Sequence, residues 1–215
     1  MRFGGISNLP VNLRSRSGGA GVAVQDGLTE PPPQSNLCVV NSNAALRQIR
    51  AFEWALVREI RLRALADSPD AFGRCLADEL SMPDQAWIER AERGALGLDT
   101  AKFIAETDAG WVGLATVRLA QDADAHADLF GLWVDPSARA AGVGLALTQT
   151  VIDWARRHGA RTLALLVVAS NAAAIHLYRR VGFEETGKSM PMPRDPSLIE
   201  IEMELDLTRS TRGPG

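Results

Sequence analysis

The residues with the clearest chemical potential lie in one short turn, Arg139-Ala-Ala-Gly142-Val-Gly144. A strand is expected just before this turn and a strongly patterned helix just after it. A helix N-terminus presents backbone N–H groups without partners and the positive end of a dipole, so it attracts phosphate. Glycine lets the backbone approach a ligand closely, and Arg139 adds a cation. A purely structural helix entry carries similar glycines, so the turn alone leaves both interpretations open.

Two common nucleotide-binding motifs do not match this turn. A Walker A loop ends in Gly-Lys-Ser/Thr, and no such ending follows Gly144. A dinucleotide fingerprint requires a third glycine, but Leu147 occupies that position. We therefore exclude both motifs.

Two downstream segments give the turn a more specific meaning. Val168-Ala-Ser-Asn171 ends an apolar run, and Tyr178-Arg-Arg-Val-Gly182-Phe183 contains the only tyrosine of the chain. In order and spacing, the three segments resemble the GCN5-related N-acetyltransferase (GNAT) family. They match its pyrophosphate motif Arg/Gln-x-x-Gly-x-Gly/Ala, the end of its fifth strand and its Tyr-x-x-x-Gly-Phe element. The resemblance extends over roughly residues 46–207.

The resemblance implies acetyl-CoA as the acetyl donor, lying in a gap between the strand at 129–134 and the strand at 163–168. The backbone of Leu132 and Val134 would pair with the pantetheine arm, the turn would hold the pyrophosphate, and Asn171 would bond the cofactor amides. Asn171 could equally be only a helix cap. The implied cofactor-binding set is Leu132, Trp133, Val134, Arg139, Ala141, Gly142, Val143, Gly144, Leu145 and Asn171.

The same resemblance implies transfer of acetyl to a primary amine of a small molecule or peptide by direct attack. Tyr178 would be the general acid to the CoA thiolate, although it could instead be a core aromatic with its hydroxyl at the surface. The base is left open between Glu106, Asp128 and water alone, and no metal is expected. A CoA-binding regulatory module without turnover is the alternative function.

The pattern along the chain predicts elements that position these residues. The fold class is α/β (α+β): a mixed, mostly antiparallel sheet of about six or seven strands, flanked by about four helices and splayed at its two central strands. Gly131, inside an apolar run, suggests a bulge. The strand at 162–168 is expected to be buried on both faces. Predicted strands cover 45–50, 101–107, 111–119, 128–134, 162–168, a segment from 182 and 198–205, and helices cover 53–66, 83–93 (ended by Gly94), 143–158 and 171–180.

Composition limits the remaining possibilities. The 215 residues are 46% hydrophobic with a formal net charge of −3, which gives no electrostatic reason to expect nucleic acid. No apolar run approaches a membrane span, and Cys38 and Cys75 lack metal-like spacing, so a cytoplasmic enzyme is expected. We expect a disordered extension over 1–43, an N-acetyltransferase domain over 44–208 and a flexible tail over 209–215. A homodimer is left open.

Overall fold

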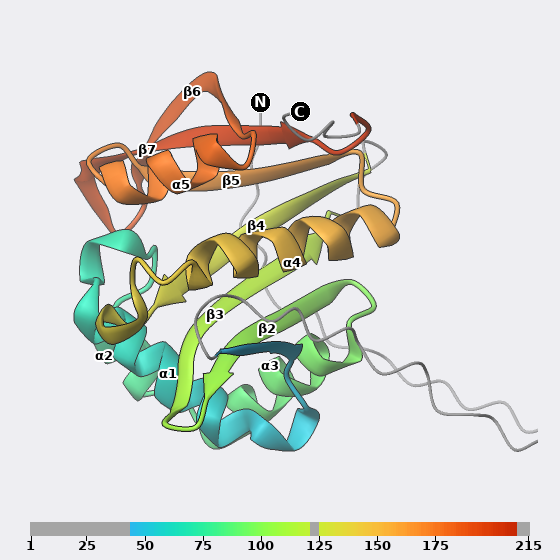
Figure 1. Ribbon diagram of the computed structural model, residues 1–215. Helices are drawn as coiled ribbons and strands as arrows, with labels where there is room; N and C mark the ends of the chain where they lie inside the picture. The colour runs from blue at the N-terminus through green and yellow to red at the C-terminus, as the bar shows by residue number, and fades with distance from the viewer. Residues whose placement is uncertain (1–43, 121–124, 210–215) are drawn as a thin grey trace, which may run out of the picture. The chain divides into compact units, whose positions relative to one another are not determined.

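The computed structural model describes residues 44–120 and 125–209, and it confirms the predicted order of elements with one addition (Figure 1). The predicted extension over 1–43 and all of the predicted tail except Arg209 lie outside the described residues. The helices are α1 Trp54–Asp67, α2 Leu76–Leu80, α3 Asp84–Leu96, α4 Val143–Arg157 and α5 Ala172–Arg180. The strands are β1 Ala45–Gln48, β2 Thr100–Thr107, β3 Gly110–Leu119, β4 His126–Val134, β5 Thr162–Val168, β6 Glu184–Met192 and β7 Asp195–Asp206.

One seven-stranded sheet, in the order β1-β2-β3-β4-β5-β7-β6, organises the described chain. Only the β4–β5 pair is parallel, and every other pair is antiparallel. Helices α4 and α5 cover one face, while α1, α2 and α3 lie on the other (Figure 1). The mixed, mostly antiparallel sheet predicted from the sequence is therefore confirmed. None of the helices in the described ranges is long and apolar enough to cross a membrane.

Side chains that alternate along the central strands supply two separate cores. Phe103 and Ala115 pack with α4 on one face, whereas Ile104 and Leu114 pack with α1 and α3 on the other. This alternation is what a strand buried on both faces requires. Helix α1 buries one apolar face, formed by Val57, Ile60 and Ala64, of which Ile60 is 1% exposed.

The sheet splays where β4 leaves β5. These strands pair at three positions, ending with Asp128 opposite Ala164. Gly131 has φ +67°, and between the pairs Leu114–Trp133 and Thr116–Phe130 strand β4 advances three residues while β3 advances two. The extra residue is a β-bulge, which bends the strand that carries it. The predicted bulge at Gly131 and the predicted splay are both confirmed.

Two predicted details are wrong. Gly94 does not end α3, which continues to Leu96 and is capped by Gly97 at φ +63°. A Cβ on Gly94 would lie 3.0 Å from the Lys102 Cβ, so this glycine permits close packing on β2. Strand β5 is not buried on both faces, because Leu166 is 46% exposed on the side away from α4 and α5.

Candidate active site

The glycine turn forms an uncapped helix N-terminus. Gly142 is the N-cap of α4 with φ +85°, and Ala140 also has a positive φ of +60°. No side chain caps α4 and no acidic residue lies in its first turn. In the described part of the chain, the N–H groups of Val143, Gly144 and Leu145 have no acceptor, since the first bond into the helix runs from the Ala146 N–H to the Gly142 carbonyl. A Cβ on Gly142 would meet nothing within 4 Å, so the turn faces open space and suits an anion.

Beyond the bulge, β4 has one open edge. The N–H of Asp135 donates to the Val112 carbonyl of β3 at 2.8 Å, so the backbone groups of the preceding Val134 point the other way, toward the side that β5 has left. The Val134 carbonyl accepts from Arg139 Nε at 3.0 Å. Leu132, two residues earlier, shares this orientation, whereas Trp133 pairs with Leu114 of β3. Leu132 and Val134 therefore face the gap between β4 and β5, where an extended ligand could pair with them as a strand does.

Side chains from the C-terminal half of α1 bond to the end of β4 and to the loop that follows it, and we call these contacts the clamp. Asp67 accepts from Trp133 Nε1 at 2.8 Å and forms an ion pair with Arg139. One turn earlier, Arg63 forms an ion pair with Asp135. The Arg139 side chain, predicted as a cation for the pyrophosphate, is therefore held by a carboxylate and by the Val134 carbonyl.

Sequence reasoning missed this clamp, although one signal was available. A negative charge at a helix C-terminus is unfavourable, because that end of the helix dipole is itself negative. Asp67 is therefore expected to bond to a donor or cation elsewhere in the fold. Asp67 and Arg139 are 72 residues apart, and their pairing requires the folded sheet.

The clamp predicts a pH-dependent effect of Asp67→Asn on stability. The hydrogen bond from Ser68 is the main cause that lowers the pKa of Asp67, with further lowering from Trp133 and Arg139 against desolvation. A depressed carboxyl pKa stabilises the fold above the unfolded pKa of about 4, and this contribution disappears as pH falls through the folded pKa. We expect the variant to lose about 1 kcal/mol of unfolding free energy at neutral pH and almost none in strong acid. Urea unfolding at both pH values measures this, and Asp108→Asn, on the exposed hairpin turn, is the control. An equal loss at both pH values would contradict the ion-pair explanation.

Tyr178 is buried on α5, with 7% of its surface exposed. Its ring centroid lies 5.6 Å from that of Phe183, and its hydroxyl bonds to no residue that the structure describes. Burial raises the pKa of the Tyr178 hydroxyl above its usual value, so it remains protonated at neutral pH. The preceding Leu177 approaches the turn, because a Cβ on Gly144 would lie 3.2 Å from Leu177 Cδ2 and 3.6 Å from Val134 Cγ2. The turn, the open end of β4 and the helix of Tyr178 therefore adjoin one another.

Asn171 is the N-cap of α5, as the cap interpretation predicts. Its Oδ1 accepts from the Ala174 N–H at 3.1 Å. The side-chain amide N–H groups of Asn171 have no acceptor among the residues described. Asn171 therefore caps the helix and keeps a donor pair available at the end of β5.

The two candidate bases, Glu106 on β2 and Asp128 on β4, lie level with opposite ends of the β2–β3 hairpin. Glu106 accepts from Arg47 Nε at 2.9 Å and from Trp111 Nε1 at 3.2 Å, and the bond from Arg47 lowers its pKa. Asp128 accepts from Arg118 at 3.1 Å at the last β4–β5 pair. Their cross-strand partners on β3, Trp111 and Arg118, are separated by a rise of about 23 Å, so at most one of the two carboxylates serves the splay.

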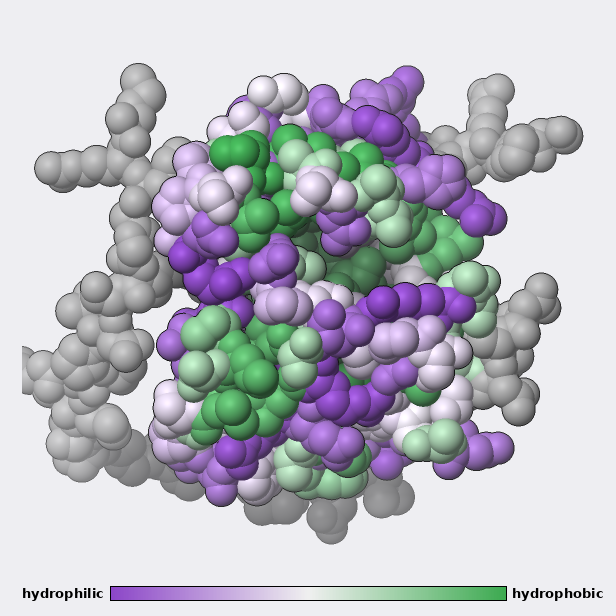
Figure 2. All heavy atoms as spheres, turned by 90° about the vertical axis from the view of Figure 1, so that its left-hand side faces the viewer, coloured by the Kyte–Doolittle hydropathy of each residue, from purple (hydrophilic) through white to green (hydrophobic). Residues whose placement is uncertain are grey.

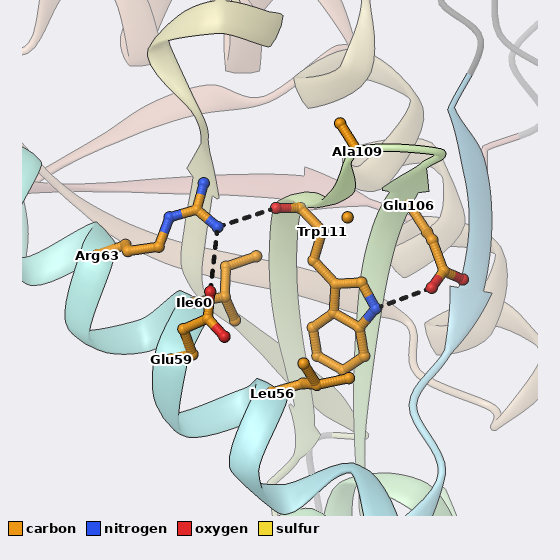
Figure 3. A pocket seen from close by; sticks show the side chains of 8 residues that line it. Leu56, Glu59, Ile60, Arg63, Glu106, Ala109 and Trp111 are labelled. Carbon is orange, nitrogen blue, oxygen red and sulfur yellow. Dashed lines mark hydrogen bonds and ion pairs between the residues drawn. The ribbon is translucent and has the colours of Figure 1, made fainter.

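Glu106 lines a pocket between α1 and the β2–β3 hairpin (Figure 3). Arg63 crosses one side of it and donates to the Trp111 carbonyl at 3.3 Å. The pocket is bordered by Leu56, Glu59, Ile60, Arg63, Glu106, Ala109, Gly110 and Trp111. The lining comes from α1, β2, β3 and the turn between the two strands, and includes no residue of β4 or β5. Asp128 lies at the base of the splay, at the last β4–β5 pair.

Viewed from the side where β4 and β5 end, the surface is hollowed between an upper and a lower part (Figure 2). Hydrophobic residues lie in the hollow and hydrophilic residues border it. An apolar groove with a few polar groups at its mouth is the usual form of a small-ligand site.

Comparison with known proteins identifies this architecture. The family model described as "Acetyltransferase (GNAT) family" matches residues 58–183, which include β4, the glycine turn, α4 and Tyr178. The chain belongs to the GNAT acetyltransferase family. The resemblance noted in the sequence is confirmed.

Individual relatives match over 137 residues in one case and 60 in another. Mycothiol acetyltransferase of Cellulomonas flavigena is 29% identical over 137 residues, covering 60% of this chain and 37% of that protein. The [ribosomal protein bS18]-alanine N-acetyltransferase of Escherichia coli K12 is 48% identical over 60 residues, covering 28% of this chain and 40% of that protein. The chain thus matches only about two fifths of the length of either relative.

Solved structures share the fold. The structure of yncA from Salmonella typhimurium with its cofactor acetyl-CoA superposes with a TM-score of 0.64 at 23% identity, covering 81% of this chain and 99% of that one. A GNAT acetyltransferase from Streptococcus pneumoniae gives a TM-score of 0.67 at 20% identity, covering 76% and 98%. At these identities the likeness is one of fold.

Proposed function

We propose that this chain transfers an acetyl group from acetyl-CoA to a primary amine by direct attack. The observation that carries the proposal is the continuity of the open edge of β4 with the uncapped start of α4. A strand-like arm joined to a pyrophosphate suits both parts at once, and the pantetheine arm of acetyl-CoA has that form. Family membership supports the same donor.

Each predicted binding residue has a defined part in this proposal. The outward backbone groups of Leu132 and Val134 pair with the pantetheine arm, and Trp133 between them keeps the strand attached to β3. The amide of Asn171 donates to a cofactor carbonyl. The pyrophosphate is held by backbone N–H groups around Arg139, Ala141, Gly142, Val143, Gly144 and Leu145.

The reaction requires one acid and a neutral amine. The amine nitrogen attacks the thioester carbonyl carbon, and a backbone N–H near Val134 stabilises the oxyanion. The carbon–sulfur bond then breaks, and the thiolate takes the proton of the Tyr178 hydroxyl. The proton released from the amine leaves through water or through Asp128 and restores the tyrosine. The products are an acetylated amine and free CoA.

Release of free thiol with an amine panel tests this function. The protein is incubated with acetyl-CoA and small amines, amino acids or an alanine-terminated peptide, and free CoA is measured. Amine-dependent thiol release supports the proposal. Tight acetyl-CoA binding without turnover on any amine would favour a regulatory module, and absence of acetyl-CoA binding would overturn the site. The cytoplasmic location, the absence of a metal and a homodimer stay predictions.

A further inference from the structure

A lysine on β2 points toward the bulge from the face that carries α1 to α3. Lys102 pairs with Thr116 of β3, which pairs with Phe130 of β4, so the three side chains share one row and one face. Lys102 Nζ donates to Thr116 Oγ1 at 2.7 Å. The same Oγ1 lies 3.8 Å from the position of a Cβ on Gly131. Lys102 and Thr116 therefore connect directly to the point where β4 parts from β5.

This lysine belongs to a cluster with too little negative charge. Glu79 of α2, which is 1% exposed, pairs with Arg61 Nε at 3.1 Å and with Arg90 Nη1 at 3.5 Å. Within the described ranges, Lys102 has no carboxylate of its own, so three cations share one anion. Burial, together with nearby Arg61 and Arg90, lowers the pKa of Lys102 to about 8. Burying cations without matching anions costs free energy, so an anionic ligand would stabilise this cluster.

The two arginines of the cluster are partly exposed and lie over aromatic rings, whereas Thr116 is buried. The side chains of Arg61 and Arg90 are 17% and 35% exposed. Arg61 lies over the Phe72 ring at 4.5 Å and Arg90 over the Trp87 ring at 5.1 Å. The indole N–H of Trp87 is buried and has no acceptor in the part of the chain that the structure describes. Donors and cations therefore exceed acceptors here.

The opposite side of the same face is acidic. Leu166 of β5 pairs with Glu202 of β7, and Ala164, opposite Asp128, pairs with Glu204. The register places these acidic residues on the face of Lys102, beyond the splay. Glu202 is paired with Lys188 at 2.8 Å and Asp128 with Arg118 at 3.1 Å, so of these three only Glu204 adds an unpaired carboxylate among the described residues. The surplus of cations at β2 suits the carboxylate of an acceptor whose amino group lies at the bulge.

We infer that Arg61, Arg90, Lys102 and Thr116 bind the carboxylate of the acceptor, and that the acceptor is a free α-amino acid. The inference rests on the proposed acetyl transfer and narrows its substrate class. The short separation of Thr116 from the bulge suits the short separation of amino group and carboxylate in an α-amino acid. Exposed Phe130 and Leu166, beside the splay, favour an apolar side chain.

The test compares amino acids with their carboxamides, for example methionine with methioninamide, in wild type and in Lys102→Met. Wild type is expected to favour the acid in kcat/KM by about tenfold or more. Lys102→Met should raise KM for the acid, leave the amide unchanged, and keep or raise Tm, because an apolar side chain replaces a partly buried charge. Should this variant not fold, Arg90→Met serves as a second variant, with exposed Arg93→Met on the same helix as the matched control.

Each outcome separates the two proposals. Preference of wild type for amides, or an equal loss on both acceptors in Lys102→Met, would overturn the carboxylate site while leaving acetyl transfer intact. Absence of acetyl-CoA binding, or of thiol release with every amine, would instead overturn the proposed function.

Discussion

Gly142→Glu is expected to abolish acetyl-CoA-dependent thiol release, with acetyl-CoA binding weakened by about 100-fold or more. The new side chain would enter the open space in front of the uncapped α4 N-terminus, where Gly142 has no neighbour within 4 Å. Its carboxylate would accept the free N–H groups and repel a pyrophosphate. The positive φ of +85° adds a conformational cost of about 1–2 kcal/mol for a residue with a Cβ. Calorimetric titration with acetyl-CoA measures the binding.

Gly159→Glu provides a matched control, because Gly159 follows the other end of α4. Gly159 has φ +80° and likewise no neighbour within 4 Å, so the two variants share the backbone strain and the added charge. Both should lower Tm, Gly159→Glu by more because its charge lies at the negative end of the α4 dipole, and only Gly142→Glu should lose acetyl-CoA binding. Retained turnover in Gly142→Glu, or equal loss of binding in both variants, would mean that the turn does not hold the pyrophosphate.

The sequence predicted most of the sheet because each long element carries its own periodic signal. Runs of strand-forming residues at 101–107 and 111–119 predicted the two strands of the β2–β3 hairpin, and a single glycine in an apolar run located the bulge. Helix α2 was not predicted, because its five residues are too few to show a helical period. It is capped by Cys75, whose Sγ accepts from the Asp78 N–H at 3.4 Å, although thiols are unusual caps.

The candidate site was predictable where its residues are close in sequence and not where they meet only in the fold. The turn, Asn171 and Tyr178 belong to three short segments that follow one another within residues 139–183. The carboxylate of Asp67 reaches Arg139 only because α1 packs against the end of β4. Nothing in the strand predicted at 101–107 distinguishes Lys102, whose significance depends on Arg61 and Arg90, which are brought to it by two different helices. Short sequence motifs therefore predict the residues that bind the acetyl donor better than those that select the acceptor amine.

Tyr178→Phe is expected to lower kcat by about 10²-fold or more while leaving the acetyl-CoA dissociation constant unchanged. The hydroxyl bonds to no described residue, so the folded protein loses no internal hydrogen bond and its Tm should stay within a few degrees. Because burial raises the pKa of Tyr178, wild type should keep its acid through the alkaline range, without a loss of rate from tyrosine ionisation below about pH 10. Thiol release measured from pH 6 to 10 tests both expectations.

His176→Ala, an exposed change on the same helix, should leave the rate as it is. Equal rates for Tyr178→Phe and wild type at every pH would remove Tyr178 as the acid. A matching loss of acetyl-CoA affinity would instead mean that the hydroxyl holds the donor without protonating its thiolate.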